Sequence, residues 1–216
     1  NKDHMYDEAE SMTISVNVPK GLMDISNGRL ISTKQLKDNT TTYTWQVTNP
    51  INNYGVNINI GDYVVFSEKY KGEKGILDCQ YYVLRNNLAK AKKQFQDVPK
   101  MLKAFEHWFG PYPFYEDSYK LVEVPYLGME HQSSVTYGNG YQNGYRGRDL
   151  SGTGWGLKFD FIIIHESGHE WFANNITYKD IADMWIHESF TNYSESLFVE
   201  YYYGKEAGAA YVRGTR

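Results

Sequence analysis

The pentad H-E-S-G-H at residues 165–169, followed by Glu188, constrains the fold of this chain more than any other feature. At 3.6 residues per turn, positions four apart lie about 40° from each other around a helix, so His165 and His169 share one face. Glu166 lies about 100° round from His165, where it can act on a water at a bound metal. Two neutral imidazoles and one carboxylate suit a single Zn²⁺ with its fourth position open to water. The pattern predicts His165, His169 and Glu188 as zinc ligands and Glu166 as general base.

Glu188 can reach the same metal only if the chain reverses direction after the pentad. Nineteen residues of continuous helix would carry Glu188 about 28 Å away from the pentad. Asn174-Asn175 is a plausible end for the first helix. Asp180 or Asp183 is a plausible N-cap for a second helix that runs from Met184 to about Tyr203. The sequence therefore predicts a pair of helices around the metal.

The predicted second helix contains two further ionisable residues whose roles can be interpreted, Glu195 and His187. Glu195 shares the face of Glu188, as does Asn192, because four and seven residues are close to one and two turns. Glu195 either accepts the free N–H of a ligand histidine or is an ordinary solvated carboxylate, and both alternatives stay open. His187 points away from that face, which favours a packing or surface histidine over a ligand.

The composition is that of a globular protein and excludes several classes of partner. With 216 residues, 41% hydrophobic and 22% charged, the chain can bury a core, and one or two domains are expected. The net charge of −4 offers no basic footprint for nucleic acid. No apolar run reaches membrane-spanning length, and the single Cys79 rules out an internal disulfide. The first residue is not Met, which indicates a processed or excised piece, so the cellular location is not predicted.

The pattern of apolar and polar residues changes near Phe66. Before it, short runs of alternating apolar and polar residues predict antiparallel strands: Met12–Val18, Tyr43–Val47 and Val56–Ile60. After it, the pattern predicts strands at 79–84 and 119–124 and helices at 88–95 and 98–109. Residues 137–156 are rich in glycine and lack the G-K-[ST] ending of a phosphate loop, so nucleotide binding is not expected. They predict a mobile loop, with a lid over the active cleft as an alternative.

Four further motifs connect the zinc pattern to a known family. L-G-M-E-H at 127–131 follows a predicted strand, and the others are F-G-P-Y-P-F at 109–114, H-E-W-F at 169–172 and W-I-H-E-S-F at 185–190. Together with H-E-x-x-H and Glu188 they resemble the M1 family of zinc aminopeptidases, the gluzincins. The resemblance extends over most of residues 60–205. More weakly, the strands of residues 5–65 look like the end of that family's N-terminal β-domain.

The resemblance implies an α+β fold in which an antiparallel β segment precedes a thermolysin-like domain with a mixed sheet and the zinc-binding helix pair. It implies domains at 1–65 and 66–216. It also implies an aminopeptidase that acts on peptides with a free N-terminus, in which Glu130 binds the substrate's α-amino group and Gly128 and Met129 lie along its backbone. Physical chemistry agrees, because a terminal ammonium needs a fixed anion and a strand can bind an extended peptide by strand addition.

The chain departs from the family's pattern at three points. Leu127 stands where the family more often has Gly, and His131 stands where it usually has Asn. The family's oxyanion-stabilising tyrosine lies several dozen residues beyond the third ligand, and the chain ends at Arg216. A fragment of low activity is therefore expected, because a lost oxyanion donor costs about 10²–10³ in kcat. A thermolysin-type endopeptidase and a non-catalytic zinc-stabilised binding module remain as alternatives.

Overall fold

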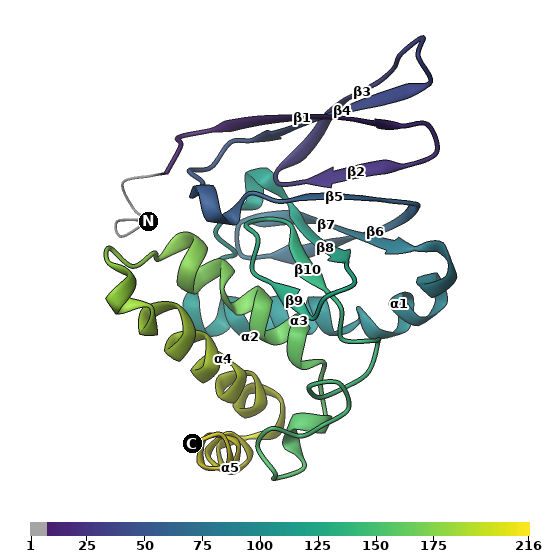
Figure 1. Cartoon of the computed structure of the whole chain (residues 1–216). Coiled ribbons are helices and arrows are strands. Elements are labelled where there is room, and N and C mark those ends of the chain that lie inside the picture. Colours follow the sequence, from purple (N-terminus) through teal and green to yellow (C-terminus); the bar gives the residue numbers. More distant parts are fainter. Residues whose placement is uncertain (1–7) are drawn as a thin grey trace.

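The computed structural model describes residues 8–216 and has the predicted α+β architecture (Figure 1). The strands are β1 (Met12–Pro19), β2 (Met23–Ser26), β3 (Arg29–Gln35), β4 (Thr40–Val47), β5 (Ile58–Gly61), β6 (Tyr63–Gly72), β7 (Gly75–Leu84), β8 (Tyr119–Glu123), β9 (Gly128–Met129) and β10 (Val135–Tyr137). The α-helices are α1 (Leu88–Gln94), α2 (Asp97–Phe109), α3 (Phe161–Gly168), α4 (Trp185–Tyr203) and α5 (Lys205–Gly214).

Strands β1 to β5 form the first layer of the molecule. β1, β4 and β3 make an antiparallel three-stranded sheet, and β2 pairs with β5. Alternation along these strands sends Ile25, Trp45 and Val47 inward, each with no exposed surface. The predicted strands are confirmed for this layer, but in β5 the alternation is reversed: Ile58 and Ile60 are exposed, while Asn59 is buried and donates to the carbonyl of Ile25. The β-domain assigned to residues 5–65 begins, at residues 5–7, outside the described residues.

A mixed sheet of five strands, in the order β6-β7-β8-β10-β9, forms the second layer. β7, β8 and β10 run parallel to one another, while β6 and β9 pair antiparallel with β7 and β10 at the two edges. Because side chains alternate along β7, Tyr82 packs against the first layer and Tyr81 packs on the helical side. The boundary predicted at residue 65 falls inside β6, so the change of sheet lies slightly earlier in the chain. The division into two domains stays a prediction.

The helices cover the other face of the mixed sheet (Figure 1). α3 packs against α2 and α4, and α5 packs against α4. Ile162, Ile163 and Ile164 at the start of α3 are all buried, as their continuous apolar run predicts. Within residues 8–216, none of the helices has the length and apolar character needed to cross a membrane.

The glycine-rich loop at 137–156 is irregular, as predicted, but hydrogen bonds and close packing hold it against the rest of the protein. The amide of Asn139 donates to Asp160 Oδ1 and to the carbonyl of Gly144, both at 2.8 Å. The carbonyl of Ser151 lies against Gly214 of α5, so close that a side chain at residue 214 would collide with it. The loop therefore packs beside the C-terminal helix, and none of its residues lines the cavity beside His165; the lid alternative stays a prediction.

Candidate metal centre

The helix that carries the pentad is anchored at its first turn by Asp160. This N-cap side chain accepts hydrogen bonds from the backbone N–H groups of Ile162 at 3.1 Å and Ile163 at 3.4 Å. It also accepts from Gln94 Nε2 at 2.8 Å and Tyr137 Oη at 2.7 Å, which tie α3 to α1 and to the sheet. The capping sets where α3 begins and so where its histidines lie.

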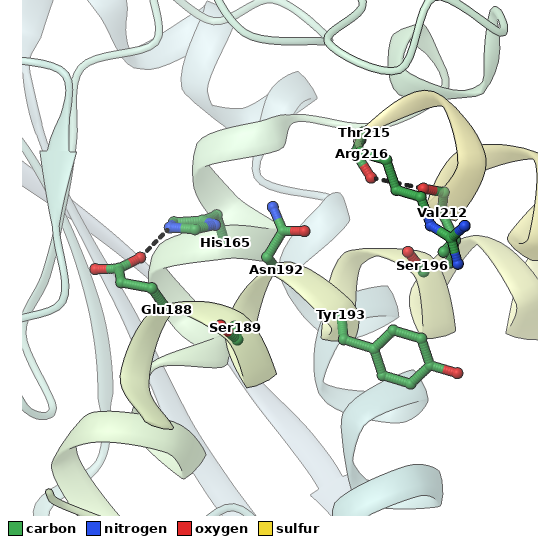
Figure 2. A pocket seen from close by; sticks show the side chains of 9 residues that line it. All are labelled: His165, Glu188, Ser189, Asn192, Tyr193, Ser196, Val212, Thr215 and Arg216. Carbon is green, nitrogen blue, oxygen red and sulfur yellow. Dashed lines mark hydrogen bonds and ion pairs between the residues drawn. The ribbon is translucent and has the colours of Figure 1, made fainter. Parts of the chain in front are cut away.

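The three predicted ligands converge on one point. Nε2 of His165 and Nε2 of His169 lie 3.6 and 3.7 Å from the same carboxylate oxygen, Oε2 of Glu188. Figure 2 shows the Glu188 carboxylate directed at the His165 imidazole from the first turn of α4. The chain reverses between the two helices, as the prediction required. A short 3₁₀ turn at Ile181–Asp183 precedes α4, and Asp180 caps this turn. Neither predicted residue caps α4 itself, whose N-cap position is Met184 without a side-chain hydrogen bond, because the turn separates Asp180 from the first turn of α4.

The other nitrogen of each imidazole is occupied. His165 Nδ1 donates to Glu195 Oε1 at 2.7 Å, and Glu195 has no exposed surface. His169 Nδ1 lies 3.1 Å from the carbonyl of Phe172 and 3.1 Å from Thr191 Oγ1. Protons on both Nδ1 atoms leave both Nε2 lone pairs facing Glu188, which is the arrangement a zinc ion needs. The donor set therefore fits zinc, and the solvated alternative for Glu195 is wrong.

Glu166 lies beside the two histidines without being their nearest carboxylate partner. One of its oxygens lies within 4.8 Å of a ring nitrogen of both His165 and His169, so proximity alone also admits it as a ligand. We favour Glu188 as the ligand, because a single Glu188 oxygen faces both Nε2 atoms at shorter distances. Burial raises the pKa of Glu166 to about 8; His165 opposes the shift and Glu130 reinforces it. A carboxyl with such a pKa is suited to moving protons near neutral pH.

The segment that contains Gly128, Met129 and Glu130 borders the same site. Gly128 and Met129 form β9, the edge strand of the mixed sheet, whose partner in that sheet is β10. A Cβ at Gly128 would lie 2.8 Å from Ile162 Cγ2 and 3.2 Å from Glu166 Cγ, so glycine allows the strand to approach α3. The pKa of Glu130 is raised by burial, and the nearby Glu188 carboxylate adds to the shift.

The two residues that depart from the family's pattern, Leu127 and His131, both have packing contacts, and the charge of His131 interacts with that of Glu130. Leu127 packs against the hydrophobic core. His131 is buried, its Nδ1 lies 3.3 Å from Thr136 Oγ1, and burial lowers its pKa. His187 is also buried and stacks on Tyr178 at a ring-centroid distance of 4.2 Å, which confirms the predicted packing role.

A cavity of about 480 Å³ opens beside His165 and Glu188 (Figure 2). Ser189, Asn192 and Tyr193 of α4 line one side, and residues of the α5 end line the other. Asn192 therefore lies on the metal side of α4, as its spacing from Glu188 predicts. Sequence reasoning did not identify Asp160, Asn174 or Tyr211 as residues that support the site; the aspartate directly before the apolar run of α3 was a readable N-cap signal.

Known proteins share both the sequence pattern and the fold. Residues 93–214 match the model of the peptidase family M1 domain. The probable aminopeptidase 1 of Sulfurisphaera tokodaii is 25% identical over 186 residues, which are 83% of this chain and 22% of that protein. The leucyl aminopeptidase of Saccharolobus solfataricus is 24% identical over 183 residues, again 83% of this chain and 22% of that protein. The chain thus spans about a fifth of the length of these relatives.

Among solved structures, an M1 zinc metallopeptidase from Deinococcus radiodurans, in a mutant bound to a Tyr-Ser-Ala substrate, superposes with a TM-score of 0.76. The sequence identity is 20%, and the match covers 93% of this chain and 42% of that one. At this identity the likeness establishes the fold, an α+β architecture with a mixed sheet and a helix pair that bears the histidines and Glu188.

Proposed function

Because the chain belongs to peptidase family M1, we propose that it forms the metal site and part of the substrate site of a zinc aminopeptidase. Such an enzyme removes residues from the free N-terminus of peptides. The single observation that carries the proposal is the position of Glu130, whose half-buried carboxylate lies close enough to Glu188 and His165 to interact with the charges of both. A carboxylate held beside a hydrolytic site suits a terminal ammonium and has no use in an endopeptidase.

His165, His169 and Glu188 would hold the zinc, with their donor atoms already facing one another. When bound, zinc supplies a Lewis acid that polarises the scissile carbonyl and lowers the pKa of water. Glu195 keeps His165 in the tautomer with a free Nε2, and the Phe172 carbonyl does the same for His169.

Glu166 is the proposed general base. Its carboxylate takes a proton from the attacking water and then delivers that proton to the leaving amine. The low exposure of Glu166, 8%, limits competition from bulk water for that proton.

Glu130 is the proposed anchor for the substrate's α-ammonium, and Gly128 and Met129 are the proposed contacts for its backbone. β9 is an edge strand, so one of its sides has backbone N–H and C=O groups that do not pair within the sheet. An extended peptide can pair with these groups by strand addition, which aligns its first peptide bond with the metal site.

The test compares hydrolysis of an aminoacyl anilide with hydrolysis of its N-acetylated form, using the natural full-length protein. An aminopeptidase cleaves the free form at least about 100-fold faster, because acetylation removes the charge that Glu130 binds. Glu130→Gln should remove most of this preference while zinc content stays unchanged. Equal rates for the two substrates would instead support an endopeptidase, and absence of any hydrolysis by the zinc-loaded protein would support a binding module.

A further inference from the structure

The chain leaves helical geometry directly after the ligand His169. Residues Glu170–Asn175 form wider turns than an α-helix, and Phe172 (φ −119°, ψ 79°) and Ala173 (φ 155°, ψ −57°) lie outside the helical region. Interruptions of this kind occur often at functional sites, because they redirect groups that a regular helix would keep in its own ladder. Here the interruption turns the Phe172 carbonyl to His169 Nδ1 at 3.1 Å.

Two side chains of the same interrupted segment form hydrogen bonds with the backbone on both sides of His131. Asn174 Nδ2 donates to the carbonyl of Glu130 at 2.7 Å. The two carboxylate oxygens of Glu170 accept from the backbone N–H of Ser133 at 3.0 and 3.2 Å. Two side chains four residues apart, immediately beyond a metal ligand, thus hold the start and the end of the turn that begins with the proposed ammonium anchor.

Glu170 and Asn174 are themselves held in place by further hydrogen bonds. Asn174 Nδ2 also lies 3.4 Å from Glu170 Oε1, and Tyr112 Oη donates to Glu170 Oε2 at 2.9 Å. The Tyr54 hydroxyl, from the first layer of the molecule, donates to Asn174 Oδ1 at 3.4 Å, which directs the amide's N–H groups towards Glu130. Glu170 has no exposed surface and Asn174 is 7% exposed. Water therefore competes little for the hydrogen bonds that these two side chains make within the protein.

From these contacts we infer that Glu170 and Asn174 are positioning residues that set the distance between the Glu130 carboxylate and the metal ligands. The inference rests on the proposed aminopeptidase function. β9 ends at Met129, so sheet pairing holds the chain only up to the residue before Glu130. The hydrogen bond from Asn174 supplies the next constraint, and it comes from the segment that bears His169. A shift of about 1 Å between an anchor and a reacting centre can cost about 100-fold in rate.

The experiment measures kcat and KM of Asn174→Ala for a free and an N-acetylated aminoacyl anilide in the natural full-length protein. Loss of the amide frees Glu130, so kcat/KM for the free substrate should fall by about 10- to 100-fold. The rise in KM should carry most of that loss. The slow hydrolysis of the N-acetylated substrate and the zinc dissociation constant should stay within about 3-fold of wild type, because neither depends on Glu130.

Asn175→Ala is the matched control, since Asn175 is the exposed neighbour of the same residue type. It should leave all four quantities unchanged. Tyr54→Phe provides a second variant that keeps the ring and removes only the hydroxyl that orients the Asn174 amide. It should reduce the preference for the free substrate in the same direction as Asn174→Ala, by a smaller factor.

An unchanged preference in Asn174→Ala, in protein that holds zinc normally, would overturn the inference. If Asn174→Ala does not fold, an unchanged preference in Tyr54→Phe overturns it instead. Failure of the proposed function looks different: the wild-type protein would then show no preference for the free substrate, or Glu130→Gln would leave the preference intact.

Discussion

His165 Nδ1 and Glu195 Oε1 lie 2.7 Å apart, and Glu195 is entirely shielded from solvent. The second oxygen of Glu195 accepts a hydrogen bond from Tyr211 Oη at 2.8 Å, so α3, α4 and α5 meet in one chain of side chains. A carboxylate in this position fixes the tautomer and the orientation of the imidazole and increases its basicity towards a metal. Three helices therefore hold the His165 imidazole in place.

Glu195→Gln should weaken zinc binding by about 10- to 100-fold, because the neutral amide no longer supports the imidazole as a charged acceptor does. Tyr211→Phe should weaken it in the same direction by a smaller factor. Competition with a chelator of known affinity measures both dissociation constants. Glu206→Gln, an exposed change on α5, is the control and should have no effect. Unaltered zinc affinity in Glu195→Gln would contradict the role given to this contact.

Glu166→Gln should lower kcat by about 10²–10⁴-fold while the zinc content stays near one ion per chain, because the amide cannot take the proton of the attacking water. Steady-state kinetics with a free aminoacyl anilide and metal analysis of the same sample test this expectation. Full activity in the variant would refute the mechanism, and loss of zinc would mean that Glu166 is a ligand.

Gly128→Ala should reduce activity and destabilise the fold by about 1–3 kcal/mol, because the new methyl collides with α3. Its Cβ would lie 2.8 Å from Ile162 Cγ2 and 3.0 Å from the Thr136 carbonyl. Gly55→Ala is the control, since its Cβ meets no atom closer than 3.7 Å. Chemical denaturation and kinetics measure the two effects, and the packing argument fails if the two alanine variants behave alike.

Ala173→Gly should raise the free energy of unfolding by about 1 kcal/mol, because φ of 155° with ψ of −57° strains any residue that has a Cβ. The greater freedom of glycine in the unfolded chain offsets part of the gain. Ala209→Gly, in the regular helix α5, should instead lower the free energy of unfolding by about 1 kcal/mol. Urea denaturation measures the free energy of unfolding of both variants. Equal losses of that free energy in Ala173→Gly and Ala209→Gly would show that residue 173 is not strained.

Asp24 should make stability depend on pH in the acidic range. Its side chain is fully buried beneath Trp45, whose Nε1 donates to it at 2.9 Å, and burial raises its pKa from 3.8 to about 6. The folded state therefore holds a proton more tightly than the unfolded state, so this group's contribution to stability is present below pH 3.8 and is lost as pH rises through about 6. Denaturation at pH 4, 5, 6 and 7 should give a shallower decline for Asp24→Asn than for wild type. If the free energy of unfolding depends on pH in the same way in both proteins, Asp24 is not the source of the pH dependence.

Much of the fold and the centre of the site could be read from short-range pattern. The period of 3.6 residues places His165 and His169 on one face whatever surrounds them, and the period of two residues assigns the inward side chains of strands such as β4. Glu188 followed from geometry as well, because only a reversed second helix could return it to the histidines.

The supporting groups could not be read in this way, because each depends on contacts between segments far apart in the sequence. The local pattern around Glu195 fits a solvated or a buried carboxylate, and its burial depends on contacts such as that with Tyr211 of α5. Asn174 reaches Glu130 only because the helix is interrupted at Phe172 and Ala173, and no local propensity signals that interruption. The sequence by itself determined which residues are the candidates for binding zinc and for hydrolysis. The tertiary structure alone decided which groups hold them in place, since hydrogen bonds and burial between distant segments exist only after the chain has packed.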